Sequence, residues 1–270
     1  MKMRNIAAAA MAGALAVSLA ACGSSASTGA ANATGEAADA AEAGSNGFTV
    51  QLGPNPETLD PALNAAVDGG NTLITIEEPL LIIDENNEVK PGQAESYEVS
   101  DDGLTYTVTL REGLKWSDGS KLDANDFVYS WKRAANPETA ADYAYMLNGI
   151  AGYPDNLQVS ASEDGKVFTV VLSAPCAYFL DLAAFPTFLP VQQAYVEANS
   201  TADKPGAWCT EAGFVSNGAF TLTEWKHNES MTYTKNPNWY DADKVTIDKI
   251  EFMLSADDTA IYAAYQAGDL

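Results

Sequence analysis

The sequence predicts a mixed α/β fold for most of the chain. Segments with apolar residues at every second position recur along it, as expected for half-buried strands. Other stretches carry capping residues at their ends and indicate helices between the strands. The 270 residues include 47% hydrophobic and 10% aromatic residues. That composition is enough to build a packed core and excludes a wholly disordered chain.

The clearest strand prediction covers residues 104–110, where leucine, tyrosine, valine and leucine alternate with three threonines. This period of two places the apolar side chains on one face. The turn residues Asp101, Asp102 and Gly103 precede the strand and predict a hairpin with residues 97–99. Further strands are expected at residues 48–52, 167–172, 219–225, 231–235 and 245–254, the last with a shift of face that indicates a bulge.

Three helices are predicted, over residues 124–133, 191–198 and 258–267. Asp123 suits the N-cap of the first, in which Phe127 and Trp131 are four residues apart on one face expected to pack in the core. Asp257 is a similar N-cap for the last helix, and Gly268 is placed to end it.

The first 22 residues resemble an export signal rather than part of the fold. Lys2 and Arg4 precede an uncharged apolar run over residues 6–21, which is shorter than the ~20 residues of a membrane-spanning helix. The run ends in Leu-Ala-Ala-Cys-Gly-Ser, which resembles the bacterial lipoprotein box. That resemblance implies cleavage before Cys22 and acylation of its thiol, so that the chain is anchored in a membrane. The alternative is an ordinary signal with an incidental cysteine.

Residues 23–47 are expected to form a flexible tether. They consist mainly of Ala, Ser, Gly, Thr and Asn, with three acidic residues as their only charges. Without large apolar side chains, such a segment cannot bury enough surface to offset the entropy of ordering it. The folded part of the chain is therefore predicted to begin near residue 48.

The charge balance and the single histidine exclude several classes of function. The chain has 14 Lys and Arg residues against 37 Asp and Glu residues, and its formal net charge of −23 opposes binding to nucleic acid. One histidine excludes a multi-histidine metal site. His227 lies in a polar stretch between two predicted strands, where it is expected to be a loop residue rather than a general base. We therefore predict no enzyme activity, no cofactor and no metal site.

Several segments occur in the order of a known family. They are residues 56–61, 78–81, 94–106, 110–119, 126–133, 178–179, 215–220, 235–240 and 265–270. Together they resemble the bacterial extracellular solute-binding proteins, family 5, which are the substrate receptors of oligopeptide, dipeptide and related ABC importers. The segments around Trp116 and Trp131 are similar to the oligopeptide-binding branch of that family.

The resemblance implies the type II fold of periplasmic binding proteins, in which two lobes enclose the ligand. Residues 48–79 and 194–270 would form the first lobe, and residues 80–193 an extra domain inserted in it. Chains of the family are much longer than this one. The second lobe is therefore expected to be missing and the sequence to be a fragment.

The same resemblance places the ligand in the cleft between the lobes, paired with the protein backbone like an added strand. Counted on from the Leu-Asp-Pro motif, the pairing segment contains Val67, Asp68, Gly69 and Gly70, within residues 65–71. The two glycines permit close approach of a ligand, and Val67 offers its amide and carbonyl. The alternative is a flexible glycine-rich loop before a helix. Asp68 departs from the family pattern.

Three aromatic residues are further ligand-binding candidates. Tyr143, Tyr145 and Phe185 lie on loops that the resemblance places near the cleft, and each is otherwise a core residue. Two other matching motifs are expected to shape the scaffold rather than to contact ligand. They are the turn at residues 116–119 and the pair Asn217 and Gly218.

Cys176 and Cys209 remain once Cys22 is assigned to lipid. In an exported chain, outside the reducing cytoplasm, such a pair favours a disulfide. The bridge would staple the return from the predicted extra domain. The alternative is two separate buried thiols.

The function implied by the resemblance is that of a lipid-anchored receptor at the outer face of the cytoplasmic membrane, on the cell surface or the periplasmic side. It would bind oligopeptides as a monomer and deliver them to ABC permease subunits, without catalysis or cofactor. Other solutes remain open, because relatives in the family take dipeptides, nickel chelates, heme or sugars. A secreted hydrolase and a surface lipoprotein without ligand are the alternatives of another class.

Overall fold

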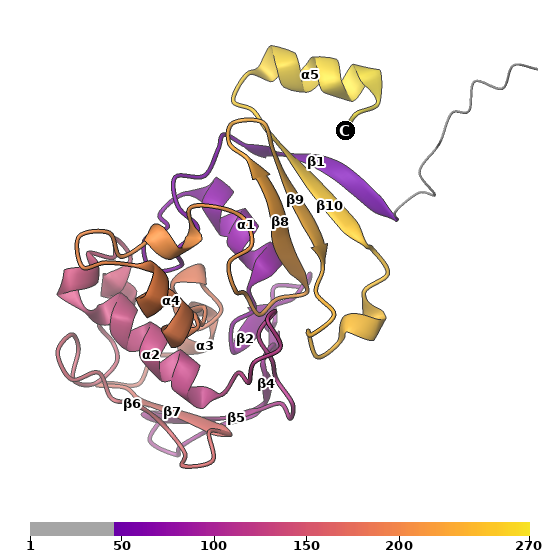
Figure 1. The fold of residues 1–270 in the computed structure, drawn as a ribbon. Helices are drawn as coiled ribbons and strands as arrows, with labels where there is room; N and C mark the ends of the chain where they lie inside the picture. Colours follow the sequence, from indigo (N-terminus) through magenta and orange to yellow (C-terminus); the bar gives the residue numbers. More distant parts are fainter. Residues whose placement is uncertain (1–45) are drawn as a thin grey trace, which may run out of the picture. The chain divides into compact units, whose positions relative to one another are not determined.

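Two four-stranded sheets organise residues 46–270, the part of the chain that the computed structural model describes (Figure 1). The predicted signal peptide over residues 1–22, with Cys22, lies outside the described residues. The same holds for the predicted tether over residues 23–47, apart from its last two positions.

The first sheet joins the beginning of the described chain to its end. Its strands are β1 (Gly47–Gly53), β8 (Phe220–Lys226), β9 (Ser230–Lys235) and β10 (Lys249–Leu254). Their order is β1-β10-β9-β8, with β1 parallel to β10 and the other pairs antiparallel. β10 begins at Lys249, later than the predicted residue 245, and a 3-10 turn over Ala242–Lys244 precedes it. The bulge predicted in β10 is wrong, since its pairing with β9 is regular and the register shift lies on β1, between Gln51 and Gly53.

The second sheet is antiparallel throughout and contains the most clearly predicted strand. Its strands are β4 (Ala94–Val99), β5 (Thr105–Leu110), β6 (Val159–Ala161) and β7 (Val167–Val171), in the order β4-β5-β7-β6. The predicted hairpin is present, with Tyr97 opposite Val108. Along β5, buried residues alternate with half-buried threonines, as a period of two requires. The strands β2 (Leu81–Ile83) and β3 (Val89–Pro91) form a separate antiparallel ribbon.

The helices of residues 46–270 include the three that were predicted. They are α1 (Val67–Ile76), α2 (Ala124–Ala135), α3 (Phe179–Leu182), α4 (Gln193–Asn199) and α5 (Asp258–Ala267). At the start of α2, Asp123 Oδ1 accepts from the amide of Asn125 at 2.9 Å, and Asp126 Oδ2 accepts from the amide of Asp123 at 2.9 Å. The two carboxylates therefore satisfy amides that the helix itself leaves unpaired. α5 begins after the N-cap Asp257 and ends at Gly268, which has a φ of 84°.

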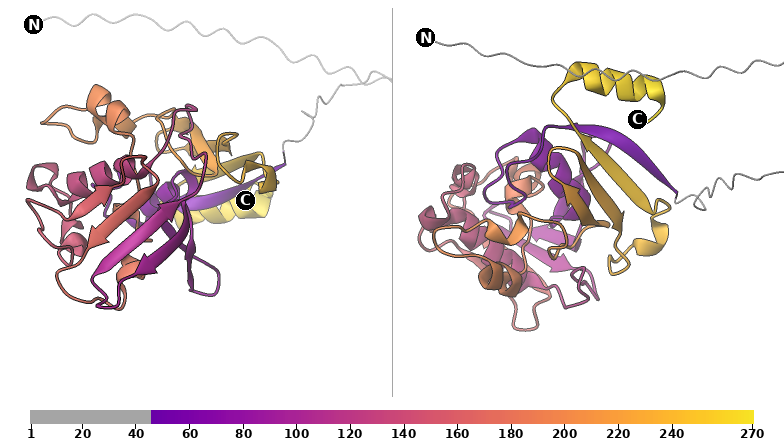
Figure 2. Two further views of the ribbon diagram at one scale, coloured as in Figure 1. Left: turned by 90° about the horizontal axis from the view of Figure 1, so that it is seen from below. Right: turned by 45° about the horizontal axis from the view of Figure 1, so that its top comes forward.

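Helix α5 lies beside the first sheet, on the side away from the second sheet (Figure 1, Figure 2). None of its residues is buried, and Tyr262 and Tyr265 are 61% and 68% exposed. Among residues 46–270, no helix is both long enough and apolar enough to cross a membrane.

Two hydrophobic clusters form the core, one for each sheet. The first packs the second sheet against α2 and contains Trp116, Phe127, Trp131 and Phe168, each at most 1% exposed. Trp131 packs edge-on against Phe168 at 4.7 Å between ring centroids, and its Nε1 donates to the carbonyl of Phe188 at 2.9 Å. Phe127 and Trp131 are thus core residues, as predicted. The fully buried members of the second cluster, under the first sheet, include Leu59, Leu73, Ile76, Met231 and Tyr233.

The clusters divide the chain close to the predicted domain boundaries. Most of the first comes from residues 80–193, and the second is drawn from residues 59–76 and 189–254. Residues 46–270 nevertheless belong to one compact unit. The division into a first lobe and an inserted domain therefore stays a prediction.

A buried ion pair between Asp60 and Arg133 joins the two clusters. Asp60 is fully buried, and its carboxylate forms a bidentate pair with the guanidinium, with Nη1 at 2.8 Å from Oδ1. The carboxylate also accepts from Trp208 Nε1 at 2.9 Å and from the amide of Ala62 at 3.0 Å. Arg133 donates further to the carbonyl of Pro205 at 3.1 Å. The pair thus ties the segment before α1 to α2 and to the loop that carries Trp208.

Replacing one member of this pair is expected to destabilise the fold strongly. Asp60→Asn leaves the buried guanidinium of Arg133 without its counter-charge, which costs about 3–5 kcal/mol of unfolding free energy. Urea denaturation measures the loss. Glu112→Gln is the matched control because it removes an exposed partner of Lys166 and should cost less than about 1 kcal/mol. Equal effects of the two substitutions would contradict the role of Asp60.

The disulfide predicted between Cys176 and Cys209 is absent, because both cysteines are free. Cys176 is half-buried and packs against the first cluster, whereas Cys209 is 1% exposed and belongs to the second. The two thiols therefore sit in different cores. Cys209 Sγ donates to the carbonyl of Gly206 at 3.5 Å, and burial raises the pKa of its thiol well above the usual range.

We expect the two thiols to differ in reactivity. An alkylating reagent should modify Cys176 in the native protein and Cys209 only after unfolding, because the reactive thiolate of Cys209 is suppressed by burial. Peptide mass mapping without prior reduction measures the modification at each cysteine. It also distinguishes the peptides of Cys176 and Cys209 from the peptide that contains Cys22. A peptide pair linked through Cys176 and Cys209 would instead restore the predicted bridge.

Candidate functional site

The segment predicted to pair with a ligand forms the start of helix α1. Val67, Asp68, Gly69 and Gly70 occupy the first turn, and only the preceding Ala66 has an extended backbone, with φ −111° and ψ 149°. A helix uses its carbonyls internally, so Val67 cannot pair with an added strand through both its amide and its carbonyl. The alternative of a flexible glycine-rich loop is also wrong for these four residues.

Gly69 has a structural reason to be glycine. It is buried, and a Cβ at this position would lie 2.0 Å from Oδ1 of Asn64. The side chain of Asn64 in turn donates to the carbonyl of Ala66 at 3.0 Å. The start of α1 is therefore packed tightly on the turn before it, and Gly69 faces that turn rather than a ligand.

Four of the predicted ligand residues line one cavity of about 360 Å³, called here the aromatic cavity. They are Val67, Gly70, Tyr143 and Phe185. The remaining lining residues are Asn64, Ala65, Ala66, Asn71, Ile74 and Pro186. Residues that are more than a hundred positions apart in sequence are thus brought together beside α1.

The wall opposite α1 consists of packed aromatic rings. Tyr143 and Phe185 meet edge-on at 5.3 Å between ring centroids, with an interplanar angle of 89°. Phe185 also packs against the first cluster, so it is both a wall of the cavity and a border of the core. The ring of Tyr145 packs against that of Tyr143, with 6.0 Å between ring centroids. Tyr145 does not line the cavity, however, and is 56% exposed. Asp68 and Gly69 do not line it either.

A second cavity, of about 430 Å³, adjoins the first and is called here the acidic cavity. It is lined by Ile74, Thr75, Glu77, Glu78, Pro79, Ile82, Ile83, Ala184, Ala219 and Trp239. Ile74, 61% exposed, lines both cavities, and Ala184 directly precedes Phe185 of the aromatic cavity. The two cavities, which share Ile74, are together called here the α1 groove.

Glu78 is held in a hydrogen-bonded network at the border of the acidic cavity. Its carboxylate accepts from Gln93 Nε2 at 2.7 Å, Trp239 Nε1 at 3.3 Å and the hydroxyl of Tyr240 at 3.2 Å. Burial raises its pKa to about 7, although these hydrogen bonds and the charge of Arg111 act in the opposite direction. Glu78 therefore keeps its proton to a higher pH than an exposed glutamate does.

Glu77 is more deeply buried and less well paired. It is 2% exposed, and its Oε2 accepts from the amide of Asn217 at 3.1 Å. Its Oε1 is buried without a hydrogen-bond partner. Burial raises the pKa of Glu77 well above its usual range, and the hydrogen bond from Asn217 offsets this only in part.

Neither glutamate was predicted as a site residue. Glu78 belongs to a family-like segment, but sequence alone does not show where its side chain lies. One signal in the sequence could have indicated them. The two acidic residues lie directly between the apolar residues Ile76 and Pro79, although glutamate is rarely buried.

Asn217 and Gly218 dock the end of α1 onto the first sheet. Asn217 Oδ1 accepts from the amide of Glu78 at 2.9 Å, and its Nδ2 donates to the carbonyl of the same residue at 2.9 Å. A Cβ at Gly218 would lie 2.5 Å from the carbonyl carbon of Ile76. The pair therefore has a structural role, which permits the close approach of two segments and fixes the position of both glutamates.

Glu78 is expected to make the stability of the protein depend on pH. Between pH 4.5 and 7 the unfolded chain loses the proton that the folded chain retains, so the unfolding free energy falls as pH rises. The shift from 4.5 to about 7 corresponds to about 3 kcal/mol. Glu78→Gln imitates the protonated form, with its amide donating to Tyr240. Urea denaturation at pH 5 and pH 8 should show a smaller loss for the variant than for the unchanged chain, and parallel losses would contradict the assignment.

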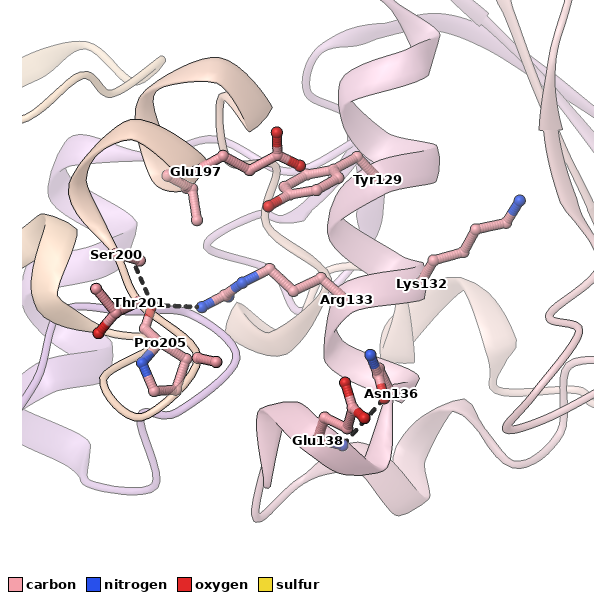
Figure 3. Close-up of a pocket in the computed structure, with 11 residues that line it drawn as sticks. Tyr129, Lys132, Arg133, Asn136, Glu138, Glu197, Ser200, Thr201 and Pro205 are labelled. Carbon is pink, nitrogen blue, oxygen red and sulfur yellow. Dashed lines mark hydrogen bonds between the residues drawn. The ribbon is translucent and has the colours of Figure 1, made fainter.

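A larger cavity, of about 680 Å³, lies elsewhere, between α2, α4 and the loop around residue 203 (Figure 3). Its charged lining residues are Lys132, Arg133, Glu138 and Glu197. As Figure 3 shows, Arg133 reaches toward Pro205, and its two Nη groups also pair with Asp60. None of the predicted ligand residues lines it. We therefore take the α1 groove as the candidate site.

Metal chemistry has no evident place in the described part of the chain. Among residues 46–270 no group of three or more His, Cys, Asp and Glu side chains is arranged to hold a metal ion. His227 Nε2 lies 3.4 Å from Oε2 of Glu211, and the residue lines neither cavity of the α1 groove. It lies between β8 and β9, in the loop where it was predicted.

Comparison with known proteins decides the family. Residues 88–270 match the model of the bacterial extracellular solute-binding proteins, family 5 (middle region). The chain belongs to this family. The oligopeptide-binding protein OppA of Bacillus subtilis is 37% identical over 84% of this chain and 42% of its own length. OppA of Salmonella typhimurium is 35% identical over 81% of this chain and 41% of its own length.

Solved structures of the family confirm the fold. Haemophilus influenzae OppA in complex with RPPGFSPFR superposes with a TM-score of 0.77 at 30% identity, covering 84% of this chain and 45% of that chain. Listeria monocytogenes OppA bound to peptide gives a TM-score of 0.77, also at 30% identity. The family 5 chain described here thus spans less than half the length of these relatives, and its mixed α/β fold is part of the bilobal fold that was predicted.

Proposed function

We propose that this family 5 chain is the peptide-binding part of a receptor for an ABC importer. Peptide would be held in the α1 groove and delivered to the permease subunits, without chemical change. The observation that carries the proposal is the aromatic cavity, because four residues expected from the family resemblance converge on it. The names of the relatives, which include oligopeptide- and dipeptide-binding proteins, support the same ligand class.

The groove offers both of the interactions that a peptide needs. Tyr143 and Phe185 present an apolar wall for a side chain, as is usual in ligand pockets. At the opposite wall, Ala66 provides no side-chain cap for the first turn of α1. In that turn the amide of Val67, which lines the cavity, is therefore available to a carbonyl or carboxylate of the ligand. Backbone amides recognise any peptide, whatever its sequence.

Binding without turnover agrees with the chemistry of the groove. Its ionisable lining side chains are Tyr143, Glu77 and Glu78, and the only histidine of the chain lies outside it. A hydrolase would need a nucleophile with an adjacent base. The secreted hydrolase is therefore less well supported than a receptor, and the aromatic cavity favours a receptor over a surface lipoprotein without ligand.

The location of the receptor is also part of the proposal. The sequence before the described residues supports an exported chain that is anchored by lipid at Cys22 and held on the outer face of the cytoplasmic membrane. The extracellular character of the family agrees with export. Residues 23–47 would then separate the lipid from the binding body as a flexible tether.

Calorimetry with a mixture of short peptides tests the proposal on the full-length protein. Phe185→Ala should weaken binding at least about tenfold, because the aromatic wall contributes more than about 1.4 kcal/mol. Tyr145→Ala is the matched control: its ring is the exposed neighbour of the wall, and its loss should change affinity less than about threefold.

Other outcomes would overturn this assignment. Unchanged affinity in Phe185→Ala would remove the aromatic cavity from the binding site. Heat from no peptide at all would favour another solute, and release of cleaved peptide would favour the hydrolase.

A further inference from the structure

The acidic cavity combines apolar walls with a titratable carboxylate. Apart from Thr75 and the two glutamates, its lining consists of the apolar and aromatic residues Ile74, Pro79, Ile82, Ile83, Ala184, Ala219 and Trp239. Within residues 46–270, no Lys, Arg or His lines it. A ligand group in this cavity is therefore surrounded mainly by hydrocarbon, which favours an uncharged side chain.

Glu78 is the glutamate that a ligand in this cavity can affect. Glu77 is 2% exposed and its Oε1 is fully buried, so a ligand does not reach it. Glu78 is half-buried and lines the cavity. Its hydrogen-bond donors belong to the neutral side chains Gln93, Trp239 and Tyr240. They pair with the carboxylate without supplying a counter-charge, so its ionised form also depends on contact with solvent.

Few titratable groups face Glu78. Against the effect of burial, the charge of Arg111 lowers the pKa of Glu78, while its guanidinium stacks over the ring of Tyr240 at 4.6 Å. Burial raises the pKa of Tyr240 and of Glu77, so that both favour their neutral forms. Other charged residues of the surrounding elements do not line the cavity. They are Asp68 on α1, Lys90 on β3, Asp181 on α3, Glu224 and Lys226 on β8, and Asp241 beside Tyr240.

We propose that Glu78 takes up a proton when an uncharged side chain of the bound peptide fills the acidic cavity, so that the α1 groove binds peptide more tightly at lower pH. The inference rests on the proposed function, since the peptide must first occupy the α1 groove. The two cavities share Ile74, so a peptide with one side chain in the aromatic cavity can place a neighbouring side chain beside Glu78. That side chain displaces solvent from the carboxylate and offers no counter-charge in return, which disfavours the ionised form.

The direction of the pH dependence follows from this desolvation. Burial already raises the pKa of Glu78 to about 7, and a side chain in the cavity raises it further. At pH 5 the carboxyl is protonated with or without peptide. As pH rises through 7, only the free protein loses the proton, so affinity falls. A further rise of about one pKa unit lowers affinity about fivefold between pH 5 and pH 8, with uptake of about 0.4 proton per peptide at pH 7.

Calorimetry on the full-length protein measures both quantities. The probes are alanine tetrapeptides that carry phenylalanine and leucine at neighbouring positions, in either order. At least one of them should bind more weakly at pH 8 than at pH 5 by the stated factor. Titration at pH 7 in two buffers of different ionisation enthalpy counts the protons exchanged, and net uptake is expected.

Glu78→Gln assigns the proton to its residue. The variant cannot titrate at this position, whereas the amino group of the peptide titrates in both proteins, so the difference in proton uptake belongs to Glu78. Glu57→Gln is the control, because it removes an exposed carboxylate that lines neither cavity, and it should retain the uptake. If Glu78→Gln fails to fold, carbon NMR of the Glu78 carboxyl group, with and without peptide, measures its titration in the unchanged protein.

The outcomes separate the two proposals. Equal proton exchange in the unchanged protein and in folded Glu78→Gln would overturn the inference and leave peptide binding intact. Proton release that disappears in Glu78→Gln would overturn it as well, because a cationic group would then occupy the cavity. Binding of none of the peptides at either pH would instead overturn the proposed function.

Discussion

The buried pair of Asp60 and Arg133 is the constraint on which the rest of the arrangement depends. Four donors converge on one carboxylate, from α2, from the Trp208 loop and from the backbone just beyond Asp60. Charges taken out of water require this degree of pairing. Because α1 begins only a few residues after Asp60, the pair also sets where the start of the helix lies against the aromatic wall. An ion pair whose members line neither cavity thus shapes the α1 groove.

The other end of α1 is fixed by neutral groups. Asn217 pairs with both backbone groups of Glu78, and Gly218 lets the chain pass against Ile76. Both ends of the helix are thus held by contacts with distant parts of the chain. A receptor with a preformed groove loses less entropy when it binds. The same segment also holds Glu77, because the amide of Asn217 donates to its Oε2 while its Oε1 is buried without a protein partner.

Local patterns in the sequence predicted the elements whose cause is local. The alternation in β5 and the capping residues of α2 and α5 are complete within their own segments, and the structure confirms them. Helix α1 is different: it has two glycines in its first turn and no side-chain cap, so intrinsic propensity argues against it. Packing of Asn64 against Gly69 decides the outcome instead. The sequence pointed to four residues of the aromatic cavity, namely Val67, Gly70, Tyr143 and Phe185. It did not point to Glu77, whose position depends on Asn217, 140 residues away. The prediction of a disulfide failed for a similar reason. The sequence does not show that Cys176 packs against the first cluster and Cys209 belongs to the second.

The parallel pairing of β1 with β10 has a consequence for how the chain acquires its shape. Their partners are about two hundred residues apart, from Gly47 with Lys249 to Gly53 with Leu254. Synthesis runs from the amino terminus, so β1 leaves the ribosome long before any residue of β10 exists. The sheet can close only after almost all of residues 46–270 have emerged, and long-range closure of this kind is slow. Until then β1 is an edge without a neighbour. The second sheet, whose strands all lie within residues 94–171, can form in the meantime.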